Sequence, residues 1–109
     1  MERKIVFLNA LITSSKMAMT LKTRPVSLNE VKEIIKEKEI ESYIGHEATA
    51  NLLSLLLNRT IPTNRSMYDP KPNDIAVIVR LRKRLEKPED IKNVSENDIE
   101  FILVEYREY

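Results

Sequence analysis

The alternation of apolar and polar positions predicts strands at both ends of the chain and in its middle. Residues 3–12 carry apolar side chains on both faces of an extended chain, which indicates a central strand. A short strand is expected at 19–23, ended by Pro25. Residues 75–84 alternate apolar and other positions, and 99–106 predict a closing strand.

Two helices are predicted between these strands. Ser27 followed by Glu30 has the spacing of a capping box and opens a helix over 28–38. A leucine-rich segment predicts a second helix over 47–58. Its inner stripe is expected at Ala48, Leu52, Leu55 and Leu56, widened by Leu53 and Leu57.

These elements predict an α/β protein, with a small mixed β-sheet of three to five strands packed with two main helices. A length of 109 residues indicates one domain, 1–109. The absence of cysteine excludes disulfides and allows a reducing compartment. No apolar run approaches the roughly 20 residues of a membrane span, so we expect no membrane association and a cytoplasmic protein.

Charge is unevenly distributed although the net charge is +1. Residues 65–88 carry seven Lys or Arg and three Asp or Glu, whereas residues 89–109 carry two and seven. A local basic stretch in a near-neutral chain indicates a defined anionic ligand. Because a general nucleic-acid coat makes the whole domain basic, we do not expect duplex DNA as a partner.

The one glycine and the one histidine, Gly45 and His46, are adjacent at the start of the second predicted helix. The first amides of a helix lack internal partners and attract phosphate. Glycine would allow close approach of a ligand, and histidine at that place suits a general acid. The alternative is a helix-capping or packing histidine.

Arginines recur at the end of the 75–84 segment, where Arg80, Arg82 and Arg84 would share one strand face about 6–7 Å apart. Guanidinium groups with that spacing match successive phosphates. The alternative is a solvated strand face whose charge is neutralised by the acidic C-terminal segment. Asn9, a polar interruption of the first strand, requires a partner in the core or a ligand.

Other chemistries lack the residues they need. With one histidine and no cysteine, a transition-metal site would need carboxylates for all its other ligands, and no cofactor is expected. A two-histidine ribonuclease mechanism is excluded within one chain. A one-histidine mechanism is possible where an RNA 2′-hydroxyl supplies the nucleophile.

Several motifs in combination resemble those of the viral anti-CRISPR ring nucleases that oppose type III CRISPR defence. They are Phe7-Leu8-Asn9-Ala10, Ile44-Gly45-His46-Glu47-Ala48-Thr49, Asn64-Arg65 and the run from Arg80 to Leu85. The resemblance implies a metal-independent nuclease in the host cytoplasm. Its substrate would be cyclic tetra-adenylate, bound across the two-fold axis of a homodimer.

The resemblance also implies residue roles. His46 would be the general acid, and the substrate contacts would come from Asn9, Gly45, Arg65, Arg84, Arg80, Thr13, Ser14 and Glu86. Leu11 and Ile12 stand before Thr13 where viral members carry polar residues. Arg80 replaces a glutamine and Lys87 a glutamate, so both changes add positive charge near the ligand. The role of Glu86 stays open.

Two other functions fit the same residues. A binding protein would sequester a cyclic or linear oligonucleotide, or dock on a host protein, with His46 as a contact. A DNA-binding regulator is the third, and its affinity for duplex would fall steeply with salt.

Overall fold

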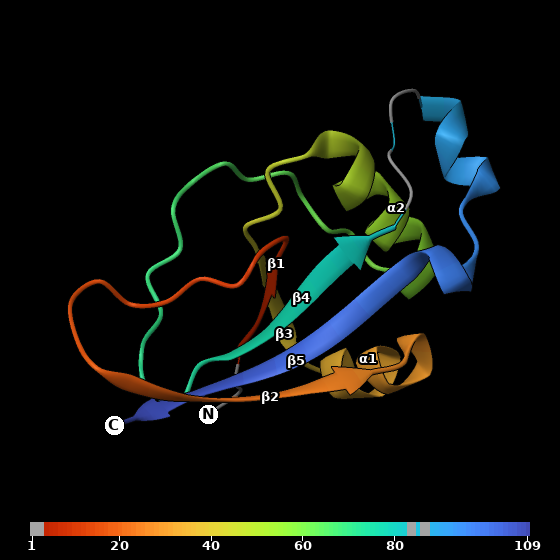
Figure 1. Ribbon diagram of the computed structural model, residues 1–109. Coiled ribbons are helices and arrows are strands. Elements are labelled where there is room, and N and C mark those ends of the chain that lie inside the picture. Colours follow the sequence, from red (N-terminus) through yellow and green to blue (C-terminus); the bar gives the residue numbers. More distant parts are fainter. Residues whose placement is uncertain (1–3, 83–84, 86–87) are drawn as a thin grey trace.

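The computed structural model describes residues 4–82, 85 and 88–109. Figure 1 shows a twisted five-stranded sheet in the order β2-β5-β4-β1-β3. The strands are β1 (Lys4–Leu8), β2 (Met19–Val26), β3 (Glu39–Ser42), β4 (Ile75–Leu81) and β5 (Ile99–Glu108). β1 pairs in parallel with β3 and β4, whereas β5 is antiparallel to β4 and β2. The predicted mixed α/β sheet with two main helices is confirmed.

The helices α1 (Leu28–Ile35) and α2 (Glu47–Leu57) pack on one face of the sheet. Val31 of α1 and Leu53 of α2 are fully buried against Phe7 of β1. The prediction that Leu55 belongs to the inner stripe is wrong, because its side chain is 70% exposed. Leu52 of the predicted stripe is buried, as are the predicted Leu53 and Leu57, and Leu55 lies outside this buried face.

The capping box of α1 is confirmed. The Ser27 hydroxyl accepts from the Glu30 amide at 3.1 Å, and the Glu30 carboxylate accepts from the Ser27 amide at 3.4 Å. The helix ends three residues earlier than predicted, at Ile35, because the chain turns through Glu37 at positive φ into β3. This strand was not predicted.

Strand boundaries differ from the sequence pattern in three places. β1 ends at Leu8, so Asn9 follows the strand and does not lie within it. β2 continues through Pro25, which an edge strand tolerates because the missing N–H faces away from the sheet. β4 ends at Leu81, so Arg80 is its last exposed side chain and Arg82 lies beyond the strand.

The other face of the sheet is covered by loops and contains a cluster of tyrosines, Tyr43, Tyr68 and Tyr106. Tyr68 lies 5.1 Å from Tyr43 and 6.1 Å from Tyr106 between ring centroids. The Tyr106 hydroxyl donates to the Ile12 carbonyl at 2.6 Å, which ties the β1–β2 loop to β5. The Tyr68 hydroxyl donates to Asp74 at 2.6 Å.

Two short 3-10 helices, η1 (Pro88–Asn93) and η2 (Glu96–Asp98), precede β5. Within the described ranges, no helix has the length and apolar character needed to cross a membrane.

Arg59 joins the long 58–74 connection to α1, and its removal should destabilise the fold. Its guanidinium donates to the Ile35 carbonyl at 2.8 Å and to the Lys38 carbonyl at 3.0 Å. Arg59→Met leaves both acceptors at the helix end without this donor, so we expect a loss of about 2 kcal/mol in urea unfolding. Arg107→Met, which removes an exposed arginine, should change stability by less than about 0.5 kcal/mol. Equal losses in the two variants would contradict this role.

Tyr106 should make stability sensitive to alkaline pH. Burial raises the pKa of the Tyr106 phenol from 10.0 to about 12. Because the folded state holds this proton more tightly than the unfolded chain, its contribution is complete below pH 10 and is lost as pH rises through about 12. We expect Tyr106→Phe to be less stable than wild type at neutral pH, and the difference to shrink between pH 10 and 12. A difference that stays constant over that range would refute the assignment.

Candidate functional site

His46 is the N-cap residue of α2 and lies on the surface. Its backbone is extended (φ −111°, ψ 117°), and its carbonyl accepts the Ala50 amide at 3.0 Å. The imidazole makes no capping hydrogen bond. His46 thus occupies the N-cap position, but its side chain neither caps the helix nor packs in the core.

Thr49 holds the imidazole of His46. Its Oγ1 lies 3.3 Å from His46 Nδ1, and the threonine is buried. The spacing i, i+3 places both side chains on one face of the first helical turn. The other ring nitrogen, Nε2, has no partner among the residues that the structure describes. The ring is thus oriented from one side and open on the other.

A hollow of about 620 Å³, here the histidine hollow, lies in front of this ring. Its walls include Asn9, His46, Thr49, Arg80 and Arg82. Asn9 follows β1, and Arg80 is the last residue but one of β4. Because these strands are parallel neighbours, both residues lie at the same edge of the sheet. The carboxyl edge of parallel strands is where open α/β sheets bind ligands.

The two arginines of the histidine hollow have different electrostatic environments. Arg82 donates through Nε to the Glu100 carboxylate at 2.9 Å, with a second, shorter contact from Nη2. This hydrogen bond, with the charges of Arg82 and Arg80, holds the pKa of Glu100 below its usual value. Arg80 forms no ion pair or hydrogen bond with the described residues. The alternative in which the acidic C-terminal segment pairs with the arginines is confirmed for Arg82. Arg80 keeps its hydrogen-bond donors available for an anion.

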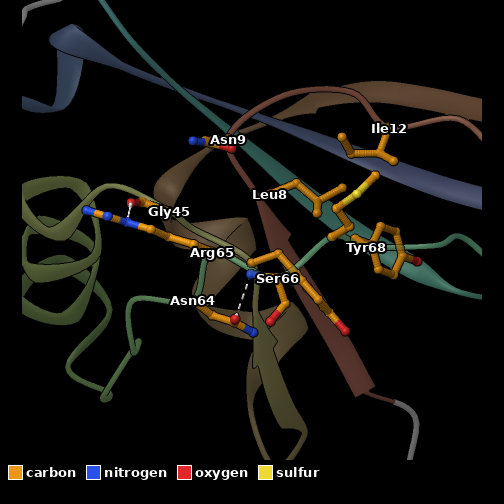
Figure 2. A pocket seen from close by; sticks show the side chains of 10 residues that line it. Leu8, Asn9, Ile12, Gly45, Asn64, Arg65, Ser66 and Tyr68 are labelled. Carbon is orange, nitrogen blue, oxygen red and sulfur yellow. Dashed lines mark hydrogen bonds between the residues drawn. The ribbon is translucent and has the colours of Figure 1, made fainter.

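Gly45 is adjacent to Arg65, as Figure 2 shows. Arg65 donates through Nε to the Gly45 carbonyl at 3.1 Å, which leaves its terminal nitrogens without partners in the described part of the chain. A Cβ at Gly45 would meet Arg65 Cγ at 3.5 Å, an ordinary van der Waals distance, and the φ of Gly45 is not positive. The backbone here therefore does not require glycine.

Asn64 positions Arg65 by fastening the 58–74 connection to the segment before α2. Its side-chain amide donates to the Ser42 carbonyl at 2.9 Å, and its backbone amide donates to the Ile44 carbonyl at 2.9 Å. Its side-chain oxygen accepts from the Ser66 amide at 2.9 Å, the dashed line near the centre of Figure 2. In the Asn64-Arg65 motif, Asn64 thus has a structural role and Arg65 is an exposed cation.

A second pocket, of about 310 Å³, adjoins the histidine hollow at Asn9. We call it the tyrosine pocket; its apolar lining is Leu8, Ile12, Tyr43, Met67 and Tyr68. Asn9, Gly45 and Arg65 lie on its polar side. Sequence analysis did not single out Tyr43 or Tyr68, and it named Thr49 only as part of a motif, without a role. Only Thr49 carried a recognisable signal, its position three residues after His46.

The structure unites some predicted site residues and not others. Asn9, His46 and Arg80 line the histidine hollow, and Gly45 and Arg65 line the tyrosine pocket. Thr13 and Ser14 line neither. The Ser14 hydroxyl accepts from the amides of Lys16 and Met17 in the β1–β2 loop.

Arg84 and Glu86, also predicted as site residues, lie outside the described residues. In the described ranges, no three His, Cys, Asp or Glu side chains lie close enough together to hold a metal ion.

Comparison with known proteins identifies relatives in viruses and bacteria. The chain is 40% identical over 73 residues to the uncharacterized protein ORF117 of Acidianus two-tailed virus, covering 65% of this chain and 62% of that protein. It is 31% identical over 99 residues to the uncharacterized protein YddF of Bacillus subtilis, covering 89% and 87%. The match to a filamentous virus of Sulfolobus islandicus, its uncharacterized protein 26, is 33% identical over 73 residues and covers 67% and 62%. The matched segment thus spans about three fifths of the two viral relatives.

A solved structure has the same fold. B116 of Sulfolobus turreted icosahedral virus superposes with a TM-score of 0.67 at 20% identity, covering 94% of this chain and 97% of that chain. A family model described as STIV B116-like matches residues 5–107. The chain therefore belongs to the STIV B116-like family.

Proposed function

We propose that the protein is a metal-independent ring nuclease that cleaves cyclic tetra-adenylate to linear di-adenylates and so antagonises type III CRISPR defence. The observation that carries the proposal is the exposed His46 ring, oriented by Thr49 and facing a hollow that also contains the unpaired Arg80. The resemblance of the sequence to the viral ring nucleases supplies the substrate.

The residues of the two pockets divide the work of an internal transesterification. Arg80 and the terminal nitrogens of Arg65 bind phosphate oxygens, helped by the first amides of α2. The ribose 2′-hydroxyl attacks the adjacent phosphorus in line and releases its proton to water. His46 Nε2 donates a proton to the departing 5′ oxygen, which leaves a linear product with a 2′,3′-cyclic phosphate.

A homodimer is part of the proposal. One chain has a single histidine. Cutting a ring of four nucleotides into two dinucleotides requires two cleavages. A two-fold axis through the ring places one His46 at each of two opposite phosphates.

A sequestering protein without catalysis is the second candidate, and one observation favours it. Among the described residues that line the histidine hollow, His46 is the one side chain suited to acid-base chemistry, so no second group is present to take the proton of the 2′-hydroxyl. Under this second function the ligand binds and stays intact.

Cleavage of cyclic tetra-adenylate in EDTA separates the two functions. Wild type should yield linear di-adenylates, and His46→Ala should reduce the single-turnover rate by about 100-fold or more, the usual contribution of a general acid. Lys32→Ala on α1 is the control and should retain the wild-type rate. An intact ring after hours with dimeric wild type that binds it would rule out the nuclease and favour sequestration.

Arg80→Gln should weaken ligand binding, because it removes the unpaired cation of the histidine hollow. Calorimetry should give a dissociation constant about ten-fold higher. The slope of log affinity against log salt should become shallower by about 0.7 for each phosphate that the variant no longer neutralises. Arg107→Gln, at the far end of β5, should leave both quantities unchanged. An unchanged salt dependence for Arg80→Gln would show that this side chain does not meet phosphate.

A further inference from the structure

We propose that the tyrosine pocket holds one adenine base of the ligand, stacked on Tyr43 with its edge against Tyr68, and read at another edge by Asn9. This inference rests on the proposed function, because it assigns the base whose phosphate lies in the histidine hollow. It adds two residues, Tyr43 and Tyr68, to which sequence analysis gave no role.

The aromatic wall of the pocket is rigid. The Tyr43 and Tyr68 rings lie 5.1 Å apart with an interplanar angle of 48°. The Tyr43 hydroxyl donates to Glu41 at 3.1 Å and the Tyr68 hydroxyl to Asp74 at 2.6 Å, so both phenol oxygens are engaged inside the protein. Burial raises the pKa of both phenols, so both rings stay neutral over the physiological range. Neutral, fixed rings are suitable platforms for base stacking.

The size and neighbours of the pocket point to a nucleoside. Its volume of about 310 Å³ is at the lower end of ligand pockets and suits one base with its ribose. Asn9 lines both this pocket and the histidine hollow, so a base in one connects directly to a phosphate in the other. Figure 2 shows that the Arg65 side chain, held on the Gly45 carbonyl, extends past Gly45 and away from Tyr68.

The free amide of Asn9 can distinguish adenine from guanine at the purine edge that carries N7. It has no hydrogen bond to any described residue, and it offers one acceptor and one donor group side by side. Adenine presents the complementary donor N6 and acceptor N7, whereas guanine presents two acceptors at the corresponding edge. A purely apolar ligand would leave the Asn9 amide and the Arg65 cation without partners.

Methionine-methyl NMR with nucleoside monophosphates tests the base site without measuring cleavage. Met67 lines the pocket and is otherwise exposed, and Met67→Leu assigns its signal. Adenosine 5′-monophosphate should shift this methyl through the ring current of the base. Ribose 5-phosphate should leave it in place, and uridine 5′-monophosphate should bind more weakly than the adenosine compound.

Two tyrosine variants give the matched comparison. Tyr43→Leu should weaken binding of adenosine 5′-monophosphate about ten-fold, the usual loss of one stacking interaction, and leave ribose 5-phosphate unchanged. Tyr43→Phe keeps the ring and should stay within about two-fold of wild type. The base site would be overturned if saturating adenosine 5′-monophosphate left the Met67 methyl signal unchanged, or if the nucleotide did not bind. Equal affinity of Tyr43→Leu and wild type for this nucleotide would also overturn it.

The outcomes separate this inference from the nuclease. If the protein binds adenosine 5′-monophosphate selectively but leaves cyclic tetra-adenylate intact, the nuclease proposal is ruled out and the base-site proposal stands. If cleavage is unaffected by Tyr43→Leu and by the identity of the base, the base-site proposal is ruled out and the nuclease proposal stands.

Discussion

Parallel pairing of β1 between β3 and β4 is the constraint on which the candidate site depends. Residues 5–8 of β1 are all buried, so this strand has packing on both faces and a fixed place in the sheet. Because the three strands run in one direction, their carboxyl ends meet at one edge. Asn9, the segment from Tyr43 to His46, and Arg80 lie there for that reason. The Tyr43 amide extends the pairing by donating to the Phe7 carbonyl at 2.9 Å.

The arginines at this edge differ in how far the protein itself occupies their hydrogen-bond donors. Glu100 lies opposite Arg80 in the β4–β5 register but accepts hydrogen bonds from Arg82, so the acidic end of the chain neutralises the arginine beyond the strand. Arg65 uses one donor within the protein, because its Nε donates to the Gly45 carbonyl, and its terminal nitrogens have no partner among the described residues. The site therefore keeps free donors on rigid supports, the arrangement that binds phosphate without large reorganisation.

Local signals predicted much of the fold. The Ser27–Glu30 capping box, the leucine-rich helix and the closing strand each depend on neighbouring residues, and all three formed as expected. β3 escaped prediction because its four residues, Glu-Ile-Glu-Ser, lack an apolar run and are held by pairing with β1. The face of α2 was misjudged at Leu55 because a run of leucines has no single apolar stripe.

The gathering of His46, Asn9 and Arg80 in one hollow was predictable, because each was singled out by its own residue type and its place at the end of a predicted element. The tyrosine pocket was not, since Tyr43 and Tyr68 come from distant segments and meet only through packing.

The most direct test of the account is ¹⁵N NMR of the imidazole of His46, the one histidine of the chain. The ligand is cyclic tetra-adenylate with each 2′-hydroxyl replaced by hydrogen, which removes the nucleophile. The account predicts that Nε2, which has no partner among the described residues, shifts on binding by much more than Nδ1, which Thr49 holds. Saturating ligand that leaves both nitrogen signals unchanged would contradict it.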